Sequence, residues 1–162
     1  TTPPPLFRTL AKRLALALVL EAIRDLPTRE VSVRTPLATT RGVALDDLVV
    51  VPILRAGLGM LEATLELFPE VAVGYLGLER DEASLHAASY YRKLPPVAGR
   101  HVLVLDPMLA TGGTLETVFT MLVSRGAAAV TGVSGASEAT SRLTAARTDS
   151  WCVRVRATSV ST

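Results

Sequence analysis

The stretch VLVLDPMLATGGT, residues 102–114, decides the fold. Its first four residues are aliphatic without alternation, which is typical of a strand covered on both faces of a parallel sheet. Asp106 follows at the carboxyl end of this strand. A helical pattern begins at Leu115, and Gly126 is placed to end it. In open α/β sheets, ligands bind beyond the carboxyl ends of strands in units of this kind.

The loop between this strand and this helix has the composition of a phosphate-binding site. Residues 110–114 are small, so backbone N–H groups at the start of a helix can approach an anion closely. Thr111 and Thr114 add hydroxyl groups, and ionised Asp106 could accept hydrogen bonds from a sugar. A phosphorylated sugar would match both groups, with its phosphate on the loop amides and its hydroxyls on Asp106. A glycine-rich turn in which Thr114 simply caps the helix is the alternative.

An earlier segment repeats the order of strand, loop and helix. Residues 47–54 form a continuous aliphatic run, and residues 58–68 have a helical pattern. Arg55, Ala56 and Gly57 form the loop between them. The planar guanidinium of Arg55 could bind a second anionic group. A solvated arginine at the end of a strand is the alternative.

The remaining segments complete an α/β pattern. A helix is predicted over residues 6–26, with Leu10, Leu14, Ala17, Leu18, Glu21 and Ala22 on its partly apolar face. Strands are predicted over residues 31–35, 71–78, 128–132 and 151–155, and a short helix over 141–146. The first of these strands alternates valine with polar residues, as an exposed edge strand does. Residues 79–94 are polar without a helical stripe and are predicted to form a long loop.

Composition limits the classes of function. The chain has 162 residues, of which 49% are hydrophobic, and we expect one domain over residues 1–162 with a parallel sheet flanked by helices. Only 4% of residues are aromatic, so a nucleic-acid surface is not supported. The longest apolar runs fall short of the roughly 20 residues that span a membrane. The single cysteine, Cys152, excludes an intramolecular disulfide and favours a reducing, cytoplasmic location.

Several motifs together resemble a known family. VLVLDPMLATGGT is similar to the phosphoribosyl pyrophosphate (PRPP) binding motif of type I phosphoribosyltransferases, and DPMLATGG resembles the uracil phosphoribosyltransferases in particular. Pro107 narrows the resemblance, because most type I families have a second acidic residue there. The likeness extends to VPILRAGLGM (51–60), GYLGLERDE (74–82) and SYYRKLP (89–95), and covers the chain from about Leu20 to Ala136.

This resemblance implies transfer of the 5-phosphoribosyl group of PRPP to uracil or a similar nitrogenous acceptor, with release of pyrophosphate. It gives catalytic roles to Asp106 and Arg80. The implied PRPP-binding residues are Arg55, Ala56, Gly57, Arg80, Asp106, Pro107, Met108, Leu109, Ala110, Thr111, Gly112, Gly113 and Thr114. Tyr90, Tyr91 and Lys93 would lie in a flexible loop that closes over PRPP. Mg²⁺ would be held mainly by PRPP oxygens, with no metal ligands assigned in the protein.

The chain departs from the family near its end. No Gly-Asp-Ala segment, which recognises the pyrimidine in the family, follows the last predicted strand, and Ser137 stands where the family usually has proline. Three possibilities stay open: an acceptor pocket built from other residues or a partner, a different acceptor, or a PRPP-binding regulator without efficient turnover. A dinucleotide-binding domain is disfavoured, because no GxGxxG follows a strand.

The predicted strand over residues 31–35 bears on assembly. In the family a comparable strand projects as an arm across a dimer partner, so the resemblance implies a homodimer. An edge strand packed within the same molecule would have the same sequence pattern.

Overall fold

The computed structural model describes residues 2–45, 47–80, 87–109, 112–137 and 156–158. Its strands are β1 (Thr28–Arg34), β2 (Thr39–Leu45), β3 (Leu48–Leu54), β4 (Ala72–Val73), β5 (Tyr75–Arg80), β6 (Ala87–Lys93), β7 (His101–Leu105), β8 (Met108–Leu109), β9 (Ala129–Val133), β10 (Ala136–Ser137) and β11 (Arg156–Thr158). Its helices are α1 (Pro4–Ile23), α2 (Leu58–Leu67) and α3 (Gly113–Ser124).

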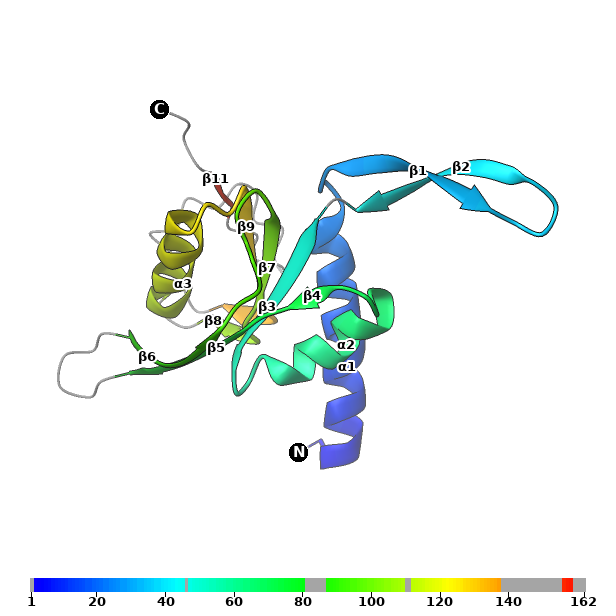
Figure 1. Ribbon diagram of the computed structural model, residues 1–162. Coiled ribbons are helices and arrows are strands. Elements are labelled where there is room, and N and C mark those ends of the chain that lie inside the picture. The colour runs from blue at the N-terminus through cyan, green and yellow to red at the C-terminus, as the bar shows by residue number, and fades with distance from the viewer. Residues whose placement is uncertain (1, 46, 81–86, 110–111, 138–155, 159–162) are drawn as a thin grey trace.

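The main sheet has the strand order β11-β9-β7-β3-β5-β6, with β4 also paired to β3 (Figure 1). Strands β9, β7, β3 and β5 are parallel, and β6 and β11 are added antiparallel at the two ends. In the centre, Val50 lies beside Leu103, and Leu103 lies beside Thr131. The predicted parallel sheet flanked by helices is therefore confirmed.

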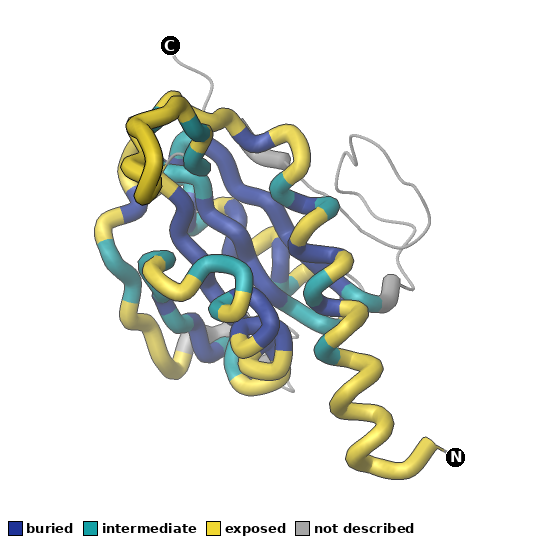
Figure 2. The backbone as a smooth tube through the Cα atoms, turned by 90° about the vertical axis from the view of Figure 1, so that its right-hand side faces the viewer, coloured by how far each residue is buried: buried dark blue, intermediate teal, exposed yellow. Residues whose placement is uncertain are grey.

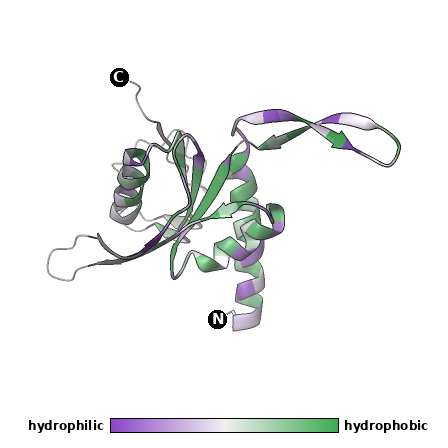
Figure 3. Ribbon diagram, in the orientation of Figure 1, coloured by the Kyte–Doolittle hydropathy of each residue, from purple (hydrophilic) through white to green (hydrophobic). Residues whose placement is uncertain are grey.

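The central strands are covered on both faces, as their unbroken aliphatic runs predict. Alternate residues of a strand point to opposite faces. Val49 and Val51 pack in the cluster that includes α3, whereas Val50 packs in the cluster that includes α1 and α2. Figure 2 shows the buried strands running through the middle of the molecule, and Figure 3 shows the matching hydrophobic residues along β3. Each fully buried valine or leucine contributes about 1.5–3 kcal/mol.

Helix α1 forms within three residues of the predicted range, and only part of its predicted apolar face is buried. The buried residues are Ala15, Leu18, Val19 and Ala22. Leu10 and Leu14 are about half exposed, at 50% and 44%. The helix carries two adjacent apolar stripes, and its N-terminal turns extend beyond the sheet (Figure 2). Periodicity alone does not determine which of two such stripes faces the core.

The predicted edge strand pairs differently from the prediction. β1 forms an antiparallel two-stranded sheet with β2, a strand that the sequence pattern did not reveal, and it does not join the main sheet. Figure 1 shows this hairpin projecting from the body of the molecule. Its turn is closed by Thr35, whose N–H and hydroxyl both donate to the Ala38 carbonyl, at 2.9 and 2.7 Å.

The region after β3 contains two further differences. The strand predicted over residues 71–78 is interrupted at Gly74, whose N–H donates to the Val50 carbonyl at 2.9 Å. The loop predicted over residues 79–94 is wrong for its second half, because residues 87–93 form β6, antiparallel to β5. Polar residues on an edge strand gave no alternating pattern there. The helix predicted over 141–146 and the strand over 151–155 lie outside the described residues.

Candidate functional site at the carboxyl edge of the sheet

The parallel strands bring the predicted loops to one edge of the sheet. Leu105, the last residue of β7, is in register with Pro52, close to the end of β3. The loop that begins at Arg55 and the loop that begins at Asp106 therefore leave the sheet side by side. This is the edge at which open α/β proteins bind ligands.

Gly57 shows how closely these two loops approach. A Cβ atom on Gly57 would lie 2.5 Å from the Leu105 carbonyl oxygen and 2.8 Å from the backbone nitrogen and oxygen of Ile53. The Gly57 N–H donates to the Ile53 carbonyl at 2.8 Å. The start of α2 thus packs against the residue that precedes Asp106, and only glycine leaves room for that contact. Arg55 and Ala56 are exposed beside it, and the Leu54–Arg55 peptide bond is cis.

Asp106 is held by its own backbone surroundings. Its N–H donates to the Val133 carbonyl of β9 at 3.1 Å, which fixes the residue at the end of the sheet. Its Oδ1 accepts a hydrogen bond from the Met108 N–H at 3.3 Å. The side chain is half-buried, and this burial raises the pKa of Asp106 above its ordinary value, while the Met108 hydrogen bond opposes that shift. Backbone hydrogen bonds thus fix the position of the carboxyl group and leave acceptor capacity on it for a ligand.

A small second sheet extends the edge beyond Asp106. β8 pairs in parallel with β10, with Met108 opposite Ala136 and Leu109 opposite Ser137. The Gly135 N–H also donates to the Pro107 carbonyl at 3.2 Å. Leu109 is buried at 2% exposure, whereas Met108 is 68% exposed. Two-residue strands leave no periodic signal, so this pairing was not predicted from the sequence.

The start of α3 forms the second half of the expected phosphate site. Gly112 occupies the N-cap position with φ +83°, a left-handed conformation that favours glycine. Thr114 is therefore not the cap, and in the described part of the chain no side chain caps this helix. The first intrahelical bond runs from the Glu116 N–H to the Gly112 carbonyl at 2.9 Å, which leaves the Gly113 and Thr114 N–H groups without an intrahelical acceptor. Ala110 and Thr111 lie outside the described residues.

The other predicted residues lie on the β5–β6 hairpin. Arg80 is the last residue of β5, and its side chain lies outside the described part of the structure. Tyr90, Tyr91 and Lys93 belong to strand β6 rather than to a loop. Their closing over PRPP stays a prediction. β5 adjoins the site because Gly77 is in register with Leu54, the residue before Arg55.

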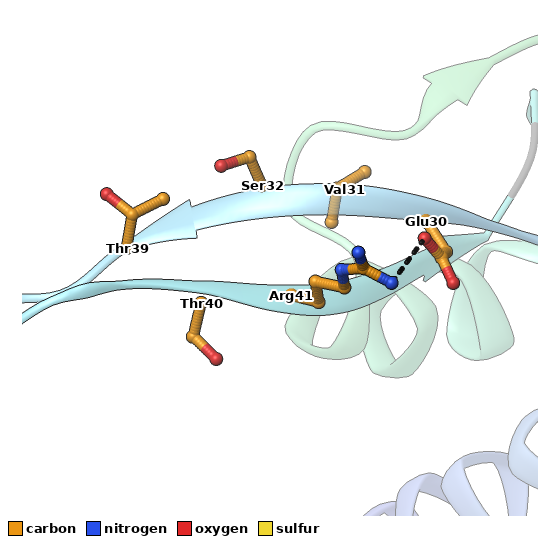
Figure 4. A pocket seen from close by; sticks show the side chains of 6 residues that line it. All are labelled: Glu30, Val31, Ser32, Thr39, Thr40 and Arg41. Atoms are coloured by element: carbon orange, nitrogen blue, oxygen red, sulfur yellow. Dashed lines mark ion pairs between the residues drawn. The ribbon is translucent and has the colours of Figure 1, made fainter.

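The described residues also include a hollow away from this edge. A shallow hollow of about 400 Å³ lies on the projecting hairpin, lined by Glu30, Val31, Ser32, Thr39, Thr40 and Arg41 (Figure 4). Its Glu30–Arg41 ion pair is 3.9 Å long between highly exposed side chains, and none of its lining residues comes from the carboxyl edge. Within the described residues, no three His, Cys, Asp or Glu side chains are grouped as metal ligands. No described helix is long and apolar enough to cross a bilayer.

Comparison with solved structures identifies the class of fold. The chain is similar to a hypoxanthine-guanine phosphoribosyltransferase of Bacillus anthracis, with a TM-score of 0.62 and 13% identity over 82% of this chain and 69% of that chain. It is also similar to a purine phosphoribosyltransferase of Pyrococcus horikoshii, with a TM-score of 0.58 and 14% identity over 78% of this chain and 72% of that one. The fold is that of the type I phosphoribosyltransferases.

Sequence comparison then gives the family. The family model described as uracil phosphoribosyltransferase matches residues 1–158. The chain is 50% identical over 135 residues to the uracil phosphoribosyltransferase of Streptomyces avermitilis, which covers 82% of this chain and 64% of that protein. A solved structure from Aquifex aeolicus is 40% identical with a TM-score of 0.77, over 84% of this chain and 66% of that chain. The chain belongs to the uracil phosphoribosyltransferase family, and it spans less than two thirds of the length of these relatives.

Proposed function

We propose that this chain transfers the 5-phosphoribosyl group of PRPP to uracil and releases pyrophosphate. The observation that carries the proposal is the contact between Gly57 and Leu105, because it holds the Arg55 loop against the strand that delivers Asp106. A cationic side chain, a carboxylate and the N-terminus of α3 thus belong to one edge. PRPP presents the matching groups: a pyrophosphate, ribose hydroxyls and a 5-phosphate. Relatives about 50% identical that are named uracil phosphoribosyltransferases support the choice of acceptor.

Each part of the edge has a task in this reaction. The N–H groups of Gly113 and Thr114 bind the 5-phosphate, assisted by the partial positive charge at the start of α3. Asp106 accepts hydrogen bonds from the ribose hydroxyls. An acceptor nitrogen of uracil gives up its proton to water and forms the new bond to the anomeric carbon as the bond to pyrophosphate breaks, and the electron pair of that bond leaves with the pyrophosphate. Arg55 and Arg80 stabilise the negative charge that grows there.

Burial of Asp106 suits this role. The pKa of its carboxyl is raised because burial disfavours the charged form, and the Met108 N–H is its hydrogen-bond donor within the described residues. Two ribose hydroxyls would supply donors and so favour the ionised form. Binding of the sugar would therefore lower the Asp106 pKa relative to that of the unliganded protein.

Mg²⁺ is part of the proposal as a companion of PRPP. The residues at this edge fit such an arrangement, because Asp106 is followed by Pro107 and the neighbouring loop carries a cation, Arg55, rather than more carboxylates. Mg²⁺ keeps several water ligands and binds phosphate oxygens readily. When bound, it would supply positive charge to the pyrophosphate, and this chain would contact it mainly through PRPP.

The projecting hairpin supports a homodimer. An isolated two-stranded hairpin is marginally stable in water. This hairpin nevertheless exposes Val33 of β1, Leu37 of its turn and Val43 of β2, at 41%, 97% and 72%. A second copy of the chain would cover these residues. The cytoplasmic location, which follows from the single cysteine, stays a separate prediction. Light scattering should give a dimer mass for the wild type and a lower mass for Leu37→Ser/Val43→Ser; equal masses would contradict the hairpin's role.

A pyrophosphate-release assay tests the function. The protein is incubated with PRPP and Mg²⁺, alone and with uracil, cytosine, hypoxanthine or orotate. We expect pyrophosphate to be released when uracil is present, and little pyrophosphate to be released with the other bases. Release with another base alone would correct the acceptor. Tight PRPP binding without pyrophosphate release in the presence of any base would indicate a regulator. Absence of PRPP binding would refute the proposal.

A further inference from the structure

The β5–β6 hairpin loses its pairing with the main sheet beyond Gly77. β3 pairs with β5 only through Ile53–Leu76 and Leu54–Gly77. Beyond Gly77, the described part of the chain gives β5 no partner strand except β6, which pairs Leu78 with Ser89 and Arg80 with Ala87. The last three residues of β5, which end at Arg80, thus form a two-stranded ribbon that leaves the sheet. Figure 1 shows β5 and β6 extending together from the body of the molecule.

A β-bulge lies at the same point. Gly77 is in register with Tyr91, but the next residue, Leu78, is in register with Ser89. Tyr90 is therefore the extra residue of β6. A bulge bends its strand, increases the local twist and redirects a side chain. Here the bend coincides with the place where β3 stops supporting β5.

The redirected side chain of Tyr90 lies across Gly77. A Cβ atom on Gly77 would lie 2.5 Å from Cζ of the Tyr90 ring, 2.6 Å from Cε2 and 2.9 Å from Cε1. The ring thus fills the space that a side chain at position 77 would occupy. Gly77 is buried, whereas Tyr90 remains 57% exposed, so the ring covers the backbone of the neighbouring strand rather than entering the core.

We propose that Tyr90 is a positioning residue whose ring, packed on Gly77, sets the angle at which the outer ribbon of β5 and β6 leaves the sheet. That angle determines where Arg80 stands relative to the Arg55 loop, since Leu54 is beside Gly77 and precedes Arg55. The inference rests on the proposed function for its catalytic consequence. The ring acts through packing, so the phenol hydroxyl is not required.

Kinetics with PRPP test the catalytic consequence. Tyr90→Ala should lower kcat/KM for PRPP by about tenfold to a hundredfold, the scale of a misplacement of about 1 Å. Tyr90→Phe should restore most of the loss, because it keeps the ring. In an Arg80→Ala background, Tyr90→Ala should cause little further loss. An equal loss in both backgrounds, or a loss in Tyr90→Phe as large as in Tyr90→Ala, would overturn the proposal.

A second cycle tests the contact itself. Gly77→Ala should displace the ring and reproduce the defect of Tyr90→Ala, but it should add little to Tyr90→Ala because the clash is then gone. Gly59→Ala is the matched control, since a Cβ there meets no atom within 4 Å. Independent losses from Gly77→Ala and Tyr90→Ala would contradict the contact.

Hydrogen exchange separates failure of this inference from failure of the proposed function. The amides of residues 78–80 and 87–89 should lose protection in Tyr90→Ala and Gly77→Ala, but not in Tyr90→Phe or Gly59→Ala. Unchanged protection in Tyr90→Ala would overturn the proposal. A wild-type protein that neither binds nor turns over PRPP would refute the function, and exchange alone would then decide whether Tyr90 sets the ribbon.

Discussion

Gly57→Ala is the substitution whose effect follows most directly from the structure. The added Cβ would lie 2.5 Å from the Leu105 carbonyl oxygen and 2.8 Å from two backbone atoms of Ile53. All three neighbours are backbone atoms, so no flexible side chain can move aside. Gly57 itself has φ −61°, which alanine adopts readily, so the effect would be steric alone. Relief of the clash requires the Arg55 loop to move away from the end of β7.

We expect two measurable consequences of Gly57→Ala. Overpacking of this kind lowers the free energy of unfolding by about 1–3 kcal/mol, measured by urea denaturation. A shift of about 1 Å in the Arg55 loop should lower kcat/KM for PRPP by about a hundredfold. When both variants are assayed below their unfolding transitions, the kinetic loss should exceed what partial unfolding explains.

Gly59→Ala is the control for this experiment. It makes the same chemical change two residues further along, in helix α2, where nothing lies within 4 Å of the new atom. There the protein should gain about 0.5–1 kcal/mol from the better helix propensity of alanine, with kinetics like those of the wild type. Equal kinetics for the two variants would refute the claim that contact between the two loops builds the site.

Three further substitutions have distinct expected results. Asp106→Asn should weaken PRPP binding in calorimetry yet stabilise the unliganded protein near pH 7. The reason is that folding raises the pKa of Asp106 above its unfolded value of 3.8, so the native state loses stability as the pH rises from 3.8 through the folded pKa. Urea denaturation between pH 3.5 and about 7 should show this loss in the wild type, and Asp106→Asn should remove the part that Asp106 contributes. Arg55→Ala should remove a charge-assisted contact of about 1.5–3 kcal/mol and raise KM for PRPP accordingly, and an unchanged KM would exclude the role. Arg100 donates to the carbonyls of Leu48 and Pro96 at 3.1 and 3.3 Å, so Arg100→Ala should lower stability by about 1–3 kcal/mol with an unchanged KM.

The sequence predicted the core of the fold because continuous aliphatic runs are specific for central parallel strands. The strands predicted over residues 102–105 and 47–54 match β7 (His101–Leu105) and β3 (Leu48–Leu54) to within one residue. Helix α3 ends just before Gly126, whose φ of +81° suits glycine. The two loops at the edge followed from the parallel order of these strands. The contact that joins them, between Gly57 and Leu105, depends on a tertiary approach that leaves no periodic signal.

The errors lie where strands are exposed or very short. β2 and β6 are rich in polar residues because they pair with only one strand, so neither showed a buried pattern. The sequence pattern around Tyr90 and Tyr91 therefore predicts a loop, whereas both residues lie in β6. The bulge that directs Tyr90 onto Gly77 shifts the register by one residue, and a residue pattern cannot reveal such a shift.

A structure of the protein with PRPP would test the central claim most directly. The account predicts the 5-phosphate within hydrogen-bond distance of the Gly113 and Thr114 N–H groups, the ribose hydroxyls on the Asp106 carboxylate and the pyrophosphate toward Arg55. PRPP bound at another edge of the sheet would contradict it. So would a complex in which those two amides are bonded to the protein and the Asp106 carboxylate makes no contact with the sugar.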